Sequence, residues 1–156
     1  MVSSTNSCAP VQPLTDPASI EQALMNVAER SFFAFAEPAD LSLADALTAD
    51  GPAMIASVSF TGPTSGSLAV TMSVSLIREL AQAFSGDPDQ EFTPADLIDM
   101  AGEFANMVTG SWLTATEPNA IFNLTMPDVR DIATAAPVSR MMQINGQPVG
   151  LTWQVG

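Results

Sequence analysis

Three polar side chains recur at helical spacing within the stretch DLIDMAGEFANMVTG, residues 96–110. Asp99, Glu103 and Asn106 are separated by four and then three positions, so a helix would place them on one face. The two carboxylates suit a cation, and the amide can donate and accept hydrogen bonds at once, which suits it to orienting a water molecule. Gly110 continues the face for one more turn without a side chain.

The same face has a simpler interpretation as the solvated side of an acidic helix, because exposed acidic helices are common. The two glycines of the stretch, Gly102 and Gly110, favour a functional reading. Each glycine costs about 1 kcal/mol relative to alanine in a helix interior, so helix stability alone does not select them. We therefore expect another surface to approach the helix closely, and we predict Gly110 as a partner-docking position.

The residue types that the chain lacks narrow its chemistry. It has 4 Lys plus Arg, all of them arginine, against 17 Asp plus Glu, and no histidine, for a net charge of -13. Without His there is no Ser-His-Asp or Cys-His catalysis and no His-based metal site, and without Lys there is no Schiff base or P-loop lysine. Catalysis must use carboxylates, amides, hydroxyls or arginine, or groups borrowed from a partner. We predict no metal site.

Charge and hydropathy also limit the partners. A strongly acidic protein repels nucleic acid phosphates and anionic lipids, so we expect neither nucleic acid nor a membrane as a partner. No segment approaches the run of about 18 apolar residues that a membrane span requires. Cys8 lies in a polar lead without the apolar run of a secretory signal, and a lone cysteine cannot form an internal disulfide. The sequence therefore predicts a cytoplasmic protein.

The polar face needs a helix to carry it, and the local signals predict one from residue 94 to about residue 112. Thr93 can cap its N-terminus, Pro94 suits the first helical position, and Asp96 follows the cap by three residues, as in an imperfect capping box. The apolar residues opposite the polar face form one arc that should be buried. These are Leu97, Ala101, Phe104, Ala105, Val108 and Trp112.

The other segments predict an α+β fold with an antiparallel sheet packed against helices. Residues 1–17 are expected to be a flexible N-terminal tail, and residues 18–156 a single domain. The expected helices are 20–37, 74–84 and 94–112, with a loop at 38–51. Alternating apolar residues predict a hairpin of strands 54–60 and 68–72, a strand at 121–126, and a hairpin of 138–144 with 149–155 around Asn145-Gly146.

The spacing of Asp99, Glu103 and Asn106 resembles the Asp/Ser-x3-Glu-x2-Asn signature of the CheC/CheX/FliY chemotaxis phosphatases. In that family the signature continues with a downstream proline, and here Pro127 stands twenty-one positions after Asn106. The stretch GEFANMVTGSW is similar to the helix that carries the motif in CheX-like proteins. No second copy of the signature occurs between Ser19 and Glu37, which favours CheX over the two-motif CheC.

The resemblance implies a CheX-like domain that dephosphorylates a CheY-type response regulator in chemotaxis or two-component signalling. It implies that Asn106 orients the hydrolytic water, that Glu103 pairs with the active-site lysine of the regulator, and that Asp99 assists docking. The phosphorylated aspartate and Mg²⁺ would come from the regulator, so the chain needs no cofactor of its own. The resemblance also implies a homodimer.

Two other functions remain open on the sequence. The same helix fits a non-catalytic binding module that docks a receiver domain or another signalling protein without changing a bond. A structural subunit that assembles through its sheet edges would instead form a large stable oligomer and tolerate substitution of Asn106.

Overall fold

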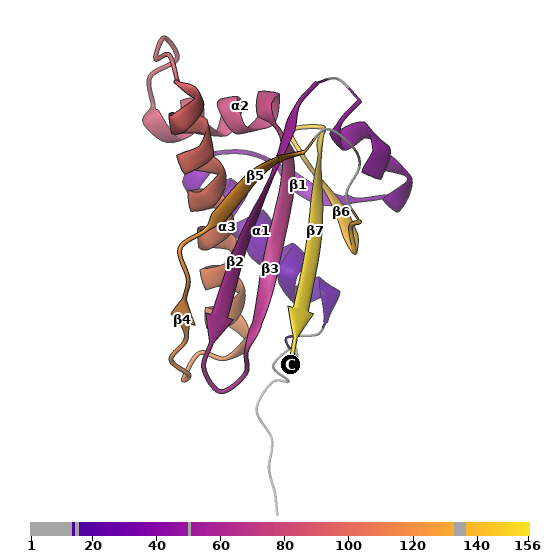
Figure 1. Cartoon of the computed structure of the whole chain (residues 1–156), viewed down its shortest axis with the longest axis vertical. Coiled ribbons are helices and arrows are strands. Elements are labelled where there is room, and N and C mark those ends of the chain that lie inside the picture. The colour runs from indigo at the N-terminus through magenta and orange to yellow at the C-terminus, as the bar shows by residue number, and fades with distance from the viewer. Residues whose placement is uncertain (1–13, 15, 50, 133–136) are drawn as a thin grey trace, which may run out of the picture.

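The computed structural model describes residue 14 and residues 16–49, 51–132 and 137–156. In that part of the chain seven strands form one antiparallel sheet, and the long helices lie behind it (Figure 1). The helices are α1 (Pro17–Phe32), the 3₁₀ helix η2 (Leu41–Leu47), α2 (Val74–Ser85) and α3 (Pro94–Thr116). The strands are β1 (Ala36–Ala39), β2 (Ala53–Thr61), β3 (Gly66–Ser73), β4 (Asn123–Leu124), β5 (Asp128–Ile132), β6 (Arg140–Ile144) and β7 (Gln147–Val155). The predicted α+β class is confirmed.

The sheet is built around the predicted β2–β3 hairpin. Its strand order is β1-β6-β7-β3-β2-β4, and β5 pairs with β2 as well. The apolar residues that alternate along the hairpin all face the helices, where they are buried. They are Met54, Ala56, Val58 and Phe60 on β2, and Leu68, Val70 and Met72 on β3. Alternation with a period of two predicted this face because successive strand side chains point to opposite sides.

Helices α1 and α3 lie side by side on that face and close the core (Figure 1). Trp112 of α3 is fully buried, and its indole Nε1 donates a hydrogen bond to the Oγ of Ser19 on α1 at 3.2 Å. The Phe60 ring of β2 meets the Trp112 ring edge to face, with 5.5 Å between centroids. This packing fixes the roll of α3, so the apolar arc points inward and the polar face points outward.

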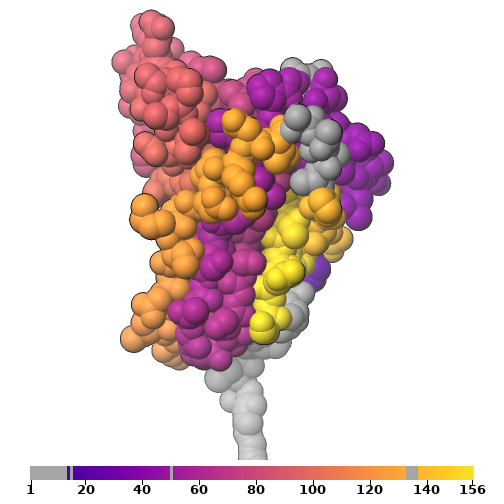
Figure 2. Space-filling model, in the orientation of Figure 1, coloured from indigo at the N-terminus to yellow at the C-terminus, as the bar shows by residue number. Residues whose placement is uncertain are grey.

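The opposite face of the sheet carries mostly small and polar side chains, with Ile55 and Ile132 among them, and Figure 2 looks onto it. Ser57, Ala69 and Thr152 form one cross-strand row there. Helix η2 covers a corner of this face, because a Cβ added at Gly150 would lie 3.1 Å from Leu47 Cδ1. No helix among the described residues is both long enough and apolar enough to cross a membrane.

The prediction of a first helix to about residue 37 was wrong. Helix α1 ends at Phe32, because Phe33 adopts the left-handed conformation with φ 53° and the Ala34 N–H donates to the Ala28 carbonyl at 2.9 Å. Glu37 and Pro38 belong instead to the edge strand β1, which pairs with β6. The predicted loop at 38–51 contains η2. Most of the predicted tail, residues 1–13, lies outside the described residues.

The prediction of a strand at 121–126 was also wrong in its extent. Only Asn123 and Leu124 pair with β2, and Met126 is 88% exposed. The strand β5, which sequence reasoning missed, follows directly and pairs with β2 from Ala53 to Ser57. The last hairpin is confirmed: Asn145 and Gly146 form its turn with φ values of 50° and 82°. Both are positive, as a two-residue type I′ turn requires.

Candidate functional site

Helix α3 starts where the sequence predicted and runs one turn further than expected, to Thr116. Both halves of the capping box are present: the Asp96 N–H donates to Thr93 Oγ1 at 3.2 Å, and the Thr93 N–H donates to Asp96 Oδ2 at 2.9 Å. The box satisfies N–H groups that a helix N-terminus otherwise leaves unpaired. The helix is thus fixed at its start by the cap and further along by the buried Trp112.

The polar face of α3 opens onto a cleft of about 630 Å³. Asp99, Glu103 and Asn106 all line it; the two acids are exposed and Asn106 is half-buried. The structure therefore brings together three of the four residues singled out from the sequence. The opposite wall of the cleft is the segment that leads from β4 into β5, with Leu124, Thr125, Met126, Pro127 and Val129.

Gly102 lies at the bottom of this cleft and explains how its two walls approach so closely. A Cβ added at Gly102 would lie 3.0 Å from Pro127 Cβ and 3.4 Å from Val129 Cγ2. The 3.0 Å distance is tighter than an ordinary contact, so a side chain there would require Pro127 to move away from α3 by a few tenths of an ångström. The expectation that a glycine on this helix marks a close approach is confirmed at Gly102, and the surface that approaches is the chain's own Pro127.

Gly110 is not part of the same cleft. A Cβ added there would meet nothing within 4 Å, and the residue lines a separate hollow of about 130 Å³ near Phe122 and Glu117. No contact within the described residues accounts for this glycine, so its role in docking a partner stays a prediction.

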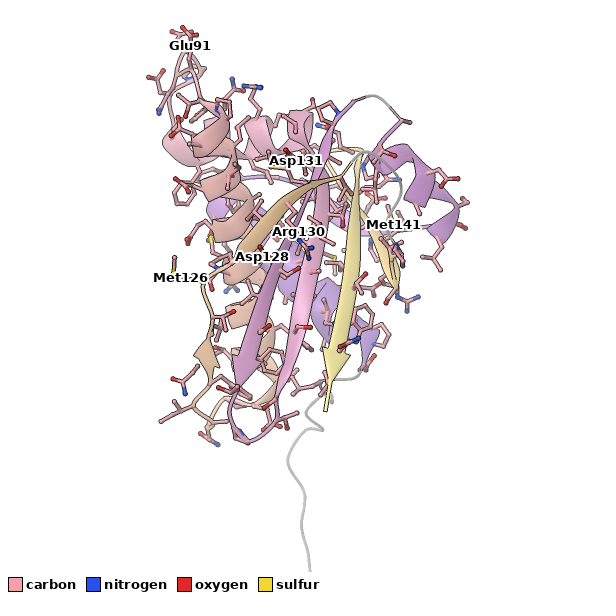
Figure 3. All side chains as sticks on the ribbon, in the orientation of Figure 1. Glu91, Met126, Asp128, Arg130, Asp131 and Met141 are labelled. Carbon is pink, nitrogen blue, oxygen red and sulfur yellow. The ribbon has the colours of Figure 1, made fainter. Side chains whose placement is uncertain are left out.

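The far wall of the cleft is held in place by β2. The Ser59 N–H donates to Thr125 Oγ1 at 3.1 Å, and the Thr125 N–H donates to the Ser59 carbonyl at 2.9 Å. Next to this clamp, Met126 points away from the sheet, and Asp128 and Arg130 lie together on β5 (Figure 3). Sequence reasoning identified Pro127 only through a family resemblance and missed Thr125, Met126 and Val129 as wall residues.

The charges at the cleft are uncompensated within the described residues. Among the described residues the ion pairs are Arg130 with Asp128 at 3.4 Å and Arg140 with Glu21 at 3.2 Å. Neither Asp99 nor Glu103 takes part in an ion pair there. In the same residues no group of three or more His, Cys, Asp or Glu side chains is arranged to hold a metal ion. Two free carboxylates beside an amide form a site that a cation from another molecule would complete.

One family model matches more than half of the chain. The family model "Chemotaxis phosphatase CheX" matches residues 54–143, a range that contains the motif helix, the cleft wall and Pro127. None of the curated proteins with which the sequence was compared matches it.

Solved structures share the fold at low sequence identity. The chemotaxis protein CheX from Desulfovibrio desulfuricans has a TM-score of 0.63 and 19% identity, over 89% of this chain and 97% of that one. CheX from Vibrio vulnificus has a TM-score of 0.64 and 18% identity, over 90% and 98%. The CheX–CheY–BeF3–Mg complex from Borrelia burgdorferi gives a TM-score of 0.57 and 13% identity, over 88% and 96%.

Proposed function

Because this chain belongs to the chemotaxis phosphatase CheX family, we propose that it hydrolyses the aspartyl phosphate of a CheY-type response regulator. The observation that carries the proposal is the single cleft lined by Asp99, Glu103 and Asn106 and closed at its base by Gly102 against Pro127. The three residues of the family signature all line this one cleft, which supports the proposal. The similar CheX from Borrelia burgdorferi occurs in a complex with CheY, beryllofluoride and Mg²⁺, in which the beryllofluoride stands in for a phosphoryl group.

The reaction is the attack of water on phosphorus. The water oxygen forms a new bond to phosphorus, the bond from phosphorus to the aspartyl oxygen breaks, and the carboxylate leaves with the electron pair. The products are inorganic phosphate and the free aspartate of the regulator, and the proton of the water passes to phosphate or solvent. Phosphoryl transfer of this kind depends mainly on positioning and charge neutralisation.

Asn106 is the residue that we assign to the water. Its amide can accept a hydrogen bond from the water while its NH₂ group donates to a phosphoryl oxygen, so it tolerates the anion that a carboxylate would repel. Asn106 is half-buried on α3, a well-anchored helix, which limits the freedom of the side chain. A rigid position matters because an in-line attack requires the water to be held on one line with the breaking bond.

Glu103 stands one turn before Asn106 and is exposed, so it can reach a partner. A carboxylate beside a phosphoryl group needs a cation, and we propose that the active-site lysine of the regulator supplies it. The Mg²⁺ ion would belong to the site of the regulator in the same way. The chain therefore completes an active site whose phosphoryl group, lysine and metal come from the other protein, and Asp99 assists docking.

Steady-state dephosphorylation of a phosphorylated CheY receiver domain tests these roles. Asn106→Ala should lower kcat on the order of 10²-fold or more, because a positioning contact at the reacting atoms is lost. Glu103→Lys should lower the rate at least as much, because the new lysine would repel the active-site lysine of the regulator. Matched controls are Asn119→Ala and Glu29→Lys, both at exposed positions outside the cleft. Hydrolysis that both cleft variants leave unchanged would exclude the assignment.

The amount of protein needed separates catalysis from simple binding. A phosphatase shortens the lifetime of the phosphorylated receiver when present at a small fraction of its concentration, because each molecule turns over many times. A binding module acts at most in proportion to the complex it forms. A lifetime that responds only to stoichiometric amounts of this protein would therefore favour the non-catalytic reading.

A further inference from the structure

A second hollow lies on the other side of the Asp99–Glu103 row. It has a volume of about 560 Å³ and is enclosed by the end of α2, the α2–α3 loop and the first half of α3. Asp99 and Glu103 line both hollows, whereas Asn106 lines only the cleft that faces Pro127. The two carboxylates therefore form a ridge that separates the cleft of Asn106, here called the catalytic side, from the second hollow. The second hollow, here called the Phe84 socket, is lined by Ala81, Phe84, Phe92 and Met100 below the two acids.

The interior of the socket is apolar and firm. Ala81 and Met100 are 4% and 9% exposed and form its floor. The Phe84 ring is 52% exposed, yet it rests on the buried Phe32 ring with 5.4 Å between centroids. Phe32 in turn packs against Phe104 of α3 at 5.4 Å. An exposed aromatic ring that is supported from behind offers a preformed surface to a partner, with little entropy lost on binding.

The rim of the socket is acidic. Asp96 also lies there, but its Oδ2 accepts the hydrogen bond from the Thr93 N–H in the capping box. Asp99 and Glu103 form no ion pair within the described residues. An apolar floor beneath free carboxylates matches an arginine or lysine side chain, whose methylene stem packs on apolar surface while its charged end stays at the rim. An exposed Phe ring adds attraction for the cation.

We infer that the Phe84 socket binds a basic side chain of the docked receiver domain, separate from the lysine that Glu103 faces on the catalytic side. Asp99 then holds the charged end of this second residue, while Phe84 packs against its stem. The inference rests on the proposed function for the identity of the partner. It makes the socket a determinant of which receivers dock, because the residue that fills it lies outside the phosphorylation pocket of the receiver.

Gln90 allows a test that leaves the floor of the socket intact. It is exposed and lines the socket from the α2–α3 loop, so Gln90→Arg places a positive charge at the rim. Gln154→Arg adds the same charge at an exposed position on β7 and serves as the control. The probe is a CheY receiver domain loaded with beryllofluoride and Mg²⁺, which reports the dissociation constant without turnover.

Gln90→Arg should weaken binding about three- to tenfold at low salt, as expected for a like charge placed at an interface rim, and Gln154→Arg should not. The difference should shrink in about 1 M salt, where charges are screened beyond about 3 Å. Phe84→Ala should weaken binding by about tenfold, because the stem of the basic residue loses the aromatic ring on which it packs. In the hydrolysis assay both socket variants should raise KM and leave kcat unchanged, unlike Asn106→Ala.

Three results would overturn the inference. Equal binding by the wild type, Gln90→Arg and Phe84→Ala means that the receiver does not enter the socket. Weak binding by Phe84→Ala together with normal binding by Gln90→Arg means that the occupant is apolar and uncharged. A fall in kcat at constant KM for either variant places the socket in the chemistry instead of in docking. Each of these results leaves the proposed function intact, whereas failure of the proposed function appears as hydrolysis that both Asn106→Ala and Glu103→Lys leave unchanged.

Discussion

Gly102 sets the distance between the motif helix and the wall that carries Pro127, and this role can be measured. Gly110→Ala, in the open part of the same helix, should stabilise the protein by about 1 kcal/mol through helix propensity. Gly102→Ala should gain less, because its Cβ would lie 3.0 Å from Pro127 Cβ and force the wall outward. Urea unfolding of both variants checks the difference.

The activity of Gly102→Ala gives a second readout. A cleft widened by a few tenths of an ångström misplaces Asn106 relative to the opposite wall, so we expect kcat/KM for receiver dephosphorylation to fall while the fold persists. Equal stabilisation by the two alanine variants, with undiminished activity of Gly102→Ala, would show that Pro127 yields freely and that the glycine does not set the spacing.

The sequence could place Asp99, Glu103 and Asn106 together because helical geometry alone fixes which residues share a face. It could not place Thr125, Met126 and Val129 opposite them. That contact joins segments far apart in the chain, and it depends on how β5 pairs with β2, which no local pattern encodes. Gly110 shares the helical face but lines a separate hollow beside Phe122 and Leu124, a distinction that spacing cannot make.

The N-terminal cap of α3 is a local contact, but its loss should lower the stability of the whole helix. Thr93→Ala removes the oxygen that accepts the Asp96 N–H, and we expect it to lower the free energy of unfolding by about 1 kcal/mol. Thr114→Ala, at an exposed position near the other end of α3, is the matched control and should not lose stability. Chemical denaturation of the two variants decides it; equal stabilities would mean that the cap contributes nothing.

Elements with strong local signals were predicted well and edge elements poorly. The β2–β3 and β6–β7 hairpins follow from clean alternation and, in the second, from Asn145-Gly146. The edge strand β1 contains a proline, and β5 is rich in charged residues, both of which mask a strand in the sequence although they are common at sheet edges. The end of helix α1 could not be predicted from the sequence, because the residue in the left-handed conformation at its C-terminus is Phe33 and not the usual glycine.

The expected homodimer concerns the molecule as a whole. Strand β1 pairs only with β6 among the described strands, and beside it Phe33 and Phe35 are 84% and 68% exposed. Apolar surface at an open sheet edge is a suitable contact for a second copy. Light scattering should give the mass of two 16.3 kDa chains. Phe35→Ser should shift the mass toward one chain, and Ile121→Ser, which replaces an exposed residue far from β1 in the chain, should not. A single-chain mass at every concentration would contradict the expectation.

The wall opposite α3 is attached to the molecule more weakly than the helix itself. It consists of β4, with two residues, and β5, whose residues are all exposed or half-buried, and both are joined to the sheet through β2. Segments with few buried contacts open at a free-energy cost well below that of global unfolding. The amide hydrogens of β5 should therefore exchange with solvent faster than those of α3. The wall would then open and close independently of global unfolding. Warming or mild denaturant would lower the population of molecules with a closed cleft while the core around Trp112 is still folded.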